Sequence, residues 1–401
     1  MKAGWKTSKL GEISLFLNRG ISPKYLDAGG ICVLNQKCVR DHRISFEPSR
    51  RHDEQAKKVG GDRFLQAGDV LVNSTGTGTL GRVAQLRDNP PEPTTVDSHV
   101  TIVRPIPGKF YPEFFGYMMV VIEDAIKDSG EGCGGQTELS RSVLADKFLV
   151  HYPESLPEQQ RIVTILDEAF DGIATAKANA EKNLQNARAL FESHLQSVFT
   201  QRGAGWVEKP LKAVCEKITD GTHQTPTYFD EGVLFLSSRN VTGGKINWDK
   251  IKYIDKKQHL EMHKRVAPRI NDILLAKNGT TGVAAIVDRD VVFDIYVSLA
   301  LLRALDVILP SFLLHFINSP VAKEQFNKRL KGSGVPNLHL QEIREVTVSF
   351  PKSLVEQQTV VSKLDALSAE TQRLESIYQQ KLAALDALKK SLLDQAFTGQ
   401  L

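Results

Sequence analysis

The sequence lacks the features that would place it in a membrane, in an oxidising compartment or among zinc-binding domains. Its 401 residues contain no run of 18 apolar residues, the length that a membrane-spanning helix needs. Residues 1–7 have no apolar core, so we expect no signal peptide. The four cysteines show no Cys-x-x-Cys spacing (Cys32, Cys38, Cys133 and Cys215). They indicate reduced thiols rather than disulfides or zinc ligands, so we expect a cytoplasmic protein without a bound metal.

Catalytic motifs are missing as well. The ten histidines form no His-Glu-x-x-His motif. The segment Asp88–Glu92 approaches the Asn-Pro-Pro-aromatic motif of amino-methyltransferases, but Glu92 replaces the aromatic residue that stacks on the target base. Gly130–Thr137 approaches a phosphate-binding loop but carries Gln136 where that loop needs lysine. We therefore expect no catalytic activity and no cofactor in this chain.

The net charge of +4 is unevenly divided. Residues 1–156 carry 20 Lys and Arg against 19 Asp and Glu, whereas residues 206–352 carry 21 against 16. The positive excess therefore belongs mainly to the second globular segment. It is compatible with a polyanionic partner without requiring one.

The most informative positive feature is an internal duplication. Three short segments of the first half recur in the second half, in the same order and at offsets of 198 to 201 residues. The pairs are Trp5–Leu10 with Trp206–Leu211, Pro153–Gln160 with Pro351–Gln358, and Phe199–Thr200 with Phe397–Thr398. A unit of this length is too long for a solenoid repeat of about 20–50 residues. It predicts two copies of one domain and its connecting element, related by a pseudo-two-fold axis.

Each copy ends in a segment with the pattern of a long helix. Residues 157–200 contain no internal proline after Pro157, and their apolar positions alternate in spacings of four and three. The first seam is Ile162, Leu166, Ala169, Ile173, Ala176 and Ala180; the second is Val360, Leu364, Leu367, Thr371, Leu374, Tyr378, Leu385, Leu388 and Leu392. Each helix, about 65 Å long at 1.5 Å per residue, would either cover its own domain or pair with the other helix. Their equal length and matching seams favour an antiparallel pair.

The two globular segments have the pattern of mainly β domains with some helix. Short apolar runs such as His99–Val103 and Val233–Leu236 are separated by Gly, Asn and Asp. A Gly-rich polar loop follows a matched run in each copy, at residues 73–82 and 277–282. Such loops either contact a phosphate or a base edge, or are simple hairpins that need glycine.

If these loops meet a base edge, side-chain chemistry predicts the contacting residues, because Arg and Lys suit guanine, Asn and Gln suit adenine, and Ser and Thr suit either. In the first copy they are Gln36, Lys37, Asn73, Ser74, Thr75, Thr77, Thr79 and Arg82. In the second copy they are His223, Gln224, Ser238, Arg239, Asn240, Lys277, Asn278, Thr280 and Thr281. Arg239 would either read a base or meet a phosphate or a nearby carboxylate. A catalytic site in place of these contacts is disfavoured by the missing motifs.

These landmarks give the chain a resemblance to the specificity subunits of type I restriction-modification systems. The carriers are the paired Leu-x-Glu-Gln-Gln helix starts (from Leu156 and Leu354), the Trp-to-Leu openings (from Trp5 and Trp206) and the C-terminal Ala396–Leu401. The segments Ile218–His223 and Arg239–Val241 also resemble sequences of target recognition domains of this family. The chain departs from the pattern at Val355, where the first copy has Pro157, and at Arg202 and Gly203.

The resemblance implies an α+β fold with two target recognition domains, residues 1–156 and 206–352, and two spacer helices, residues 157–205 and 353–401. Each domain would read one half of a bipartite site in double-stranded DNA. The helices would form an antiparallel coiled coil on which two modification methyltransferase subunits dock. S-adenosylmethionine, ATP and Mg²⁺ would bind those subunits and the restriction translocase subunits. The alternative is a coiled-coil scaffold or adaptor without DNA specificity.

Overall fold

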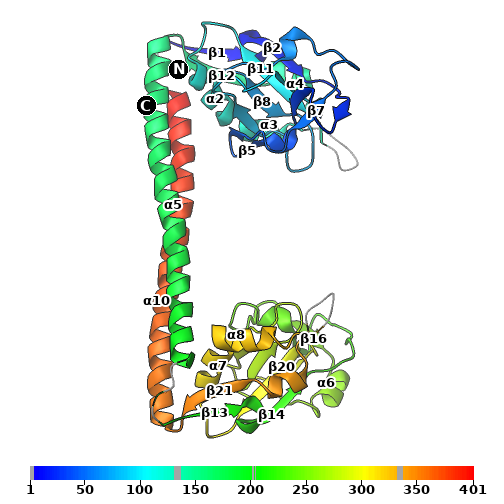
Figure 1. Ribbon diagram of the computed structural model, residues 1–401, viewed down its shortest axis with the longest axis vertical. Helices are drawn as coiled ribbons and strands as arrows, with labels where there is room; N and C mark the ends of the chain where they lie inside the picture. Colours follow the sequence, from blue (N-terminus) through cyan, green and yellow to red (C-terminus); the bar gives the residue numbers. More distant parts are fainter. Residues whose placement is uncertain (1–3, 131–136, 201–202, 204, 332–336) are drawn as a thin grey trace. The chain divides into compact units, whose positions relative to one another are not determined.

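The computed structural model describes residues 4–130, 137–200, 203, 205–331 and 337–401 (Figure 1). The chain forms two compact units, Met1–Asn179 with Lys381–Leu401, and Ala180–Gln380. Cys133 and Gln136 lie outside the described residues, whereas the other three cysteines are buried free thiols. Within the described part of the chain, no helix has the length and apolar character needed to cross a membrane.

Before its long helix, the described part of the first unit contains twelve strands, four short α-helices and two 3-10 turns. Its elements are β1 (Trp5–Lys9), α1 (Leu10–Ile13), β2 (Ser14–Arg19), β3 (Tyr25–Leu26), β4 (Ile31–Leu34), η1 (Gln36–Cys38), β5 (Val39–Arg40), β6 (Arg43–Ile44), β7 (Arg50–His52), η2 (Gly61–Arg63), β8 (Val70–Asn73), β9 (Val83–Gln85), β10 (Thr94–Val96), β11 (Val100–Pro105), α2 (Pro112–Val121), α3 (Glu123–Asp128), α4 (Arg141–Asp146), β12 (Leu149–Pro153) and α5 (Leu156–Thr200).

The second unit repeats most of this order. Its elements are β13 (Trp206–Pro210), η3 (Leu211–Ala213), β14 (Cys215–Asp220), β15 (Val233–Leu236), η4 (Ser238–Asn240), β16 (Lys252–Ile254), α6 (Lys256–Met262), β17 (Ile273–Ala276), β18 (Ala284–Ile286), β19 (Phe293–Ile295), β20 (Leu299–Ala304), α7 (Pro310–Asn318), α8 (Pro320–Asn327), α9 (Leu340–Arg344), β21 (Thr347–Pro351) and α10 (Leu354–Thr398). Helix α6 follows β16, a place where the described part of the first unit has no α-helix.

The sheets show that the duplication extends to strand order. An antiparallel sheet ordered β2-β11-β8-β9 in the first unit matches β14-β20-β17-β18 in the second. A further sheet in each unit holds one parallel pair, β4 with β10 and β15 with β19. The opening strands β1 and β13 pair with β12 and β21, the strands that lead into the long helices. The predicted α+β architecture is therefore confirmed.

Each unit contains the same buried ion pair, which the sequence comparison did not reveal. Arg104 donates two hydrogen bonds of 2.7 Å to the carboxylate of Asp69, and Arg303 donates bonds of 2.8 and 2.7 Å to Asp272. Both carboxylates are buried, and each also accepts a hydrogen bond from the main chain three residues before it. A forked arginine bond of this kind fixes the geometry of both partners. It holds β11 to the turn before β8, and β20 to the turn before β17.

The Leu-x-Glu-Gln-Gln motif places a buried amide at the start of each long helix. The Gln159 side chain accepts a hydrogen bond of 2.8 Å from the Tyr111 main chain and donates one of 2.8 Å to the Pro153 carbonyl. Gln357 makes the equivalent bonds in the second unit. Both glutamines are fully buried. The amide therefore ties the helix start to the preceding strand and to the neighbouring helix, which explains why this residue recurs.

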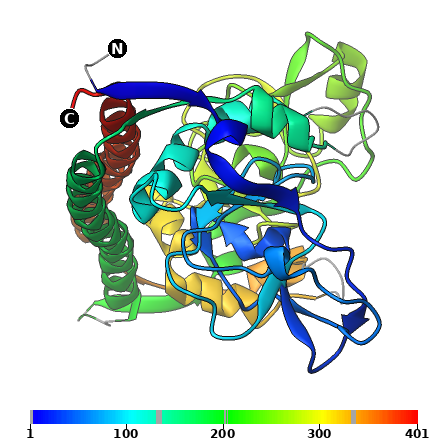
Figure 2. The same cartoon turned by 90° about the horizontal axis from the view of Figure 1, so that it is seen from above.

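Helices α5 and α10 lie side by side (Figures 1 and 2) and pair within each unit. In the first unit, Arg161 donates a hydrogen bond to the Leu401 carbonyl and Lys177 donates one to Asp386, so the two helices run in opposite directions. In the second unit, Arg188 donates a hydrogen bond of 2.8 Å to Glu375. The predicted antiparallel pairing is confirmed.

The long helices also complete the core of each unit, so the two arrangements weighed from sequence both occur. Ile162 and Leu166 from α5 pack in the first core with Phe397 from α10. The second core contains Phe199 from α5 and Leu364 from α10, together with β-domain side chains. The predicted seam is buried or half-buried as far as Leu385. It is wrong at Leu388, which is 47% exposed, whereas the next predicted position, Leu392, is half-buried and Leu393 beside it is buried.

Candidate nucleic-acid interface

Two glycines in equivalent turns show which residues of the two units correspond. A Cβ on Gly20 would lie 1.9 Å from the Val96 carbonyl oxygen, and a Cβ on Gly221 would lie 1.9 Å from that of Ile295. Only glycine allows this close approach of two backbones. The equivalence aligns Arg19 with Asp220, the residues just before the glycines. The two units therefore share one turn here, which carries opposite charges at Arg19 and Asp220.

The 3-10 turns η1 and η4 present one exposed cation in each unit. Asn35 and Ser237 precede these turns as N-caps, and the middle residues are Lys37 and Arg239. Both middle side chains are exposed. The turn therefore offers a positive charge at the same place in both units, with a point-like ammonium in one and a forked guanidinium in the other.

The third residue of each turn is used inside the fold. The Ser237 amide donates a hydrogen bond of 2.9 Å to the Asn240 side chain, whose nitrogen in turn donates to the carbonyls of Asn247 and Lys250. Asn240 is buried, so its amide is taken up by the loop rather than offered to a ligand. Its counterpart is Cys38, a thiol whose pKa is raised to about 11 by burial. We therefore revise the sequence-based hypothesis that Asn240 meets adenine.

Several predicted residues of the first unit come together in one polar network. The Gln36 amide donates to the Thr75 hydroxyl at 2.6 Å, and the Thr79 hydroxyl donates to the Gln36 carbonyl oxygen at 3.2 Å. Thr75 also lies 2.7 Å from Nδ1 of His99. His99 is exposed and was missed from the sequence. The network brings the ends of β4 and β8 and the start of β11 to one edge.

Other residues of the first loop hold its shape. Asn73 and Ser74 are fully buried, and Ser74 bonds to the Thr101 hydroxyl at 2.5 Å. Arg82 donates to the Gly78 carbonyl at 2.9 Å and so closes the loop. Thr77 is exposed at the tip. The predicted residues of this loop therefore fall into two groups: buried side chains that hold its shape, and a smaller number of side chains that are exposed to solvent.

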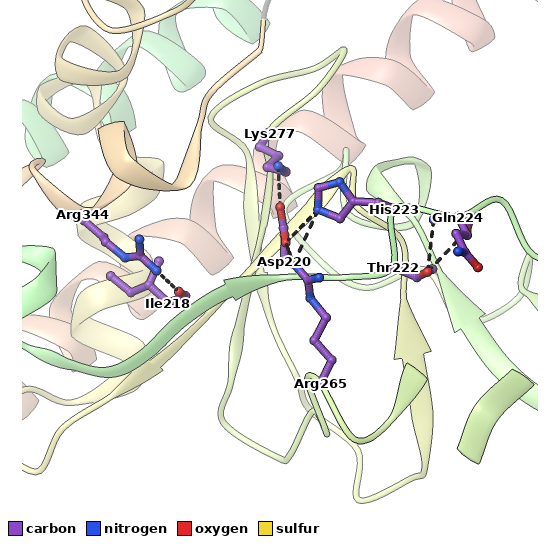
Figure 3. Close-up of polar contacts among 8 residues, drawn as sticks. All are labelled: Ile218, Asp220, Thr222, His223, Gln224, Arg265, Lys277 and Arg344. Atoms are coloured by element: carbon purple, nitrogen blue, oxygen red, sulfur yellow. Dashed lines mark hydrogen bonds and ion pairs between the residues drawn. The ribbon is translucent and has the colours of Figure 1, made fainter. Parts of the chain in front are cut away.

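In the second unit, Asp220 is the centre of a charged cluster (Figure 3). Its buried carboxylate accepts hydrogen bonds of 2.8 Å from Lys277 and 2.7 Å from Arg265, with His223 at 3.3 Å. Burial alone would raise the pKa of Asp220. The hydrogen bonds and positive charges of Lys277 and His223 lower this pKa by more than burial raises it, so the net shift is downward. Lys277 is buried and therefore supports the turn, whereas His223 and Arg265 reach solvent.

The remaining predicted residues of the second unit surround this cluster. Gln224 is exposed, and its main-chain amide donates to the Thr222 hydroxyl at 3.3 Å (Figure 3). Asn278 is half-buried and forms a bridge with Asn337. Thr280 is exposed and Thr281 half-buried on the loop after β17. Residues 278–282 of this loop correspond to residues 75–81 of the first unit and are two residues fewer.

Each unit also carries a cation stacked on an exposed tyrosine, at equivalent positions. The Arg50 guanidinium lies 3.4 Å from the centre of the Tyr25 ring, and the Lys252 ammonium lies 3.7 Å from that of Tyr228. The rings are 42% and 38% exposed. The two tyrosines lie in matching Pro-x-Tyr-x-Asp segments, Pro23–Asp27 and Pro226–Asp230, a sequence signal that could have pointed to these pairs.

In the second unit this tyrosine borders a pocket of about 610 Å³. Its walls include Tyr228, Phe235 and Tyr296, the turn residues Ser238 and Arg239, and the cations Lys250 and Lys252. Aromatic rings provide surfaces for stacking a base, and the cations suit a phosphate. The pocket therefore has the chemistry of a nucleotide-binding surface.

Comparisons with known proteins agree with this geometry. A family model described as the type I restriction modification DNA specificity domain matches residues 204–383. The type I restriction enzyme EcoBI specificity subunit from Escherichia coli is 24% identical over 336 residues, covering 77% of this chain and 70% of the relative. Residues 204–383 therefore match the type I restriction modification DNA specificity domain, and most of the chain is similar to a type I specificity subunit.

Further similarities concern a second curated relative and two solved structures. The EcoKI specificity subunit of Escherichia coli strain K12 is 22% identical over 203 residues, 49% of this chain and 43% of the relative. A chain from a structure concerning complex assembly and conformational transition of the type I R-M system gives a TM-score of 0.80 at 18% identity, with 100% and 99% coverage. The HsdS subunit from Thermoanaerobacter tengcongensis gives 0.59 at 18% identity, with 100% and 98% coverage. These likenesses support the fold of a type I specificity subunit.

Proposed function

We propose that this type I specificity subunit reads a bipartite sequence in double-stranded DNA, one half-site with each unit, and is not itself catalytic. The observation that carries the proposal is the equivalence of Lys37 and Arg239 on matched turns. In the second unit the cation–tyrosine pair borders the same pocket as Arg239, and the first unit carries an equivalent pair. A shared scaffold that presents different polar side chains is suited to reading two different half-sites.

Two units that recognise different half-sites need different side chains at equivalent positions, and the two units do differ there. Gln36 of the first unit corresponds to Ser238 of the second, whereas the exposed His99 corresponds to Ser298, which is buried and accepts a hydrogen bond from the Ser238 amide. A glutamine amide can form two hydrogen bonds with adenine, and the Arg239 fork can do so with guanine. The exposed cations at Arg50 and Lys252 suit phosphate oxygens, which fix register without carrying sequence.

Matched clefts in the two units are the surfaces on which we place two modification subunits. In the first unit, Tyr117 bonds to Asp167 at the wall of a cleft of about 610 Å³. In the second, His315 lies 2.7 Å from Asp365 at the wall of a cleft of about 1020 Å³. Each cleft lies between the β domain and the helix pair of its own unit, so two copies of one partner could use equivalent surfaces.

The chemistry of the complex is assigned to those partners. S-adenosylmethionine would bind the modification methyltransferases, and ATP and Mg²⁺ would serve the restriction translocase subunits, all acting on DNA in the cytoplasm. Calorimetry with the isolated chain should therefore detect no binding of S-adenosylmethionine. Binding at micromolar donor concentration would contradict the non-catalytic assignment.

The DNA-binding proposal is tested with the purified complex of this chain and its methyltransferase partner. Retention on a duplex that contains the target should exceed retention on a scrambled duplex, and it should fall as salt rises. Equal retention on both duplexes at every salt concentration would instead favour a scaffold without sequence specificity.

A further inference from the structure

A cluster of two histidines and one aspartate in the second unit has no role in the interface described above. His259 lies in α6, His263 follows as its C-cap residue, and Asp294 lies in β19. Nδ1 of His259 is 2.7 Å from one carboxylate oxygen of Asp294, and Nδ1 of His263 is 3.1 Å from the other. The two rings are 4.7 Å apart between centres.

The spacing of these atoms fits a small transition-metal ion. One ligand atom from each of the three residues lies within 4.8 Å of the other two. In a tetrahedral zinc site with bonds of about 2.0–2.2 Å, ligand atoms stand about 3.3 Å apart. Side-chain movements of less than about 1 Å would therefore convert the hydrogen-bonded cluster into a coordination site.

The donor set is also selective. Two imidazoles and one carboxylate suit Zn²⁺ and similar borderline ions, whereas Mg²⁺ and Ca²⁺ prefer oxygen ligands. The carboxylate is almost fully buried at 2% side-chain exposure, while the His259 and His263 side chains are 15% and 32% exposed. An ion could thus enter from the histidine side and meet a fixed anionic ligand.

We propose that His259, His263 and Asp294 form a binding site for a divalent transition-metal ion of the Zn²⁺ class. A metal there would join α6 to β19. Helix α6 is in turn linked to the loop before β15, because the Gln258 side chain exchanges hydrogen bonds of 2.9 and 3.1 Å with the Thr227 main chain. Among the described residues of the first unit no α-helix directly follows β7, the counterpart of β16, so no equivalent of α6 supplies histidines there.

A consequence for DNA reading rests on the proposed function. Thr227 precedes Tyr228, the ring under Lys252 that borders the pocket near Arg239. A bound ion would hold this ring in place and would strengthen binding at the second half-site only. Metal binding itself is measured without DNA, so failure of the metal site and failure of the DNA-binding proposal can be told apart.

The experiment uses the full chain with a tag that contains no histidine, titrated with Co²⁺ and then with Zn²⁺. We expect one Co²⁺ per chain, with a visible absorption band that Zn²⁺ removes. The His259→Gln and His263→Gln variants should each weaken Co²⁺ binding by at least about tenfold. The control is His339→Gln, which changes an exposed histidine at the N-cap of α9 and should leave binding unchanged.

Two results would overturn the proposal. One is a wild-type chain that binds neither Co²⁺ nor Zn²⁺. The other is a Co²⁺ band that persists in a folded variant carrying both glutamines. X-ray absorption of the Zn²⁺-loaded wild type adds a test that needs no variant: it should show two imidazole ligands, and a ligand set without imidazole would refute the assignment.

Discussion

Lys37 and Arg239 are equivalent residues, each the middle residue of a 3-10 turn that follows a buried strand of a sheet with one parallel pair. Their neighbours in the turn face inward, because Cys38 and Asn240 both accept a hydrogen bond from the N-cap main chain. The turn therefore isolates a single exposed cation. The two units differ here in hydrogen-bonding geometry. The Arg239 guanidinium can donate two parallel hydrogen bonds to one base, whereas the Lys37 ammonium is a point-like donor.

Arg239 is the sharpest test of base reading. If its guanidinium forks onto guanine, Arg239→Lys should relax preference at one position of one half-site, at a cost of roughly 1–3 kcal/mol. If it meets a phosphate, Arg239→Lys should be nearly silent, whereas Arg239→Ala should weaken binding to all sequences and reduce the salt slope by about one. Binding selections with randomised duplexes distinguish the two. No effect of either variant would remove Arg239 from the interface.

Lys277 should act on stability rather than on reading. Its ammonium is buried against Asp220, so Lys277→Met leaves that carboxylate with only its more exposed partners. Removing one member of a buried ion pair costs about 3 kcal/mol or more. Urea unfolding should show this loss, while the folded variant keeps its sequence preference. A variant of normal stability with an altered half-site would contradict the supporting role.

The same cluster predicts an acid limit for the second unit. The pKa of Asp220 is lowered in the folded state, so its stabilising contribution is present above the unfolded value of about 3.9 and is lost as pH falls through the lower folded value. Stability measured from pH 6 to pH 2 should therefore fall below about pH 4. Asp220→Asn should flatten that part of the curve, and an unchanged curve would show that Asp220 is not responsible.

Gln357 and its neighbour Gln358 form a matched pair for testing the helix-start motif. The Gln357 amide is fully buried and has three main-chain partners, whereas Gln358 is exposed. Gln357→Ala should cost about 2–3 kcal/mol, because buried polar groups lose their partners. Gln358→Ala should stay within about 0.5 kcal/mol. Gln159 and Gln160 repeat the contrast in the first unit, and equal effects at both positions would contradict the account.

Sequence reasoning succeeded where the signal is periodic or duplicated. The seam through Ile162, Leu166 and Ile173 fixed the character of α5, because a heptad spacing over many turns leaves few alternatives. Lys37 and Arg239 were among the predicted contacts because cationic side chains suit guanine, a property that the sequence shows directly. Those signals are local, so they can be read without the fold.

The sequence failed where a side chain's role depends on distant partners. Lys277 and Arg239 are both cations after apolar runs, yet one is buried against Asp220, 57 residues away, and the other is exposed. Asn240 carries the chemistry of an adenine reader but is used by its own loop. The pairs of Arg50 with Tyr25 and of Lys252 with Tyr228 depend on strand register, which single-sequence patterns do not give.

The paired helices should set the gap between the half-sites without changing the bases read. Seven residues inserted after Ala180 in α5 and seven after Gln380 in α10 preserve the heptad seam. They add about 10.5 Å of helix, which corresponds to roughly three base pairs. Mapping the target of the altered complex should show a longer gap between unchanged half-sites. An unchanged gap would refute the role of the helices as a spacer.

The central claim is that each unit reads its own half-site, and exchanging one unit's recognition segment tests it most directly. Residues 206–352 would be replaced by the corresponding segment of a family relative with a different target, and methylated positions would be mapped in cells that also express the methyltransferase partner. The account predicts a bipartite target in which one half-site changes while the other half-site is kept. A change in both half-sites, or methylation that still follows the original target, would contradict it.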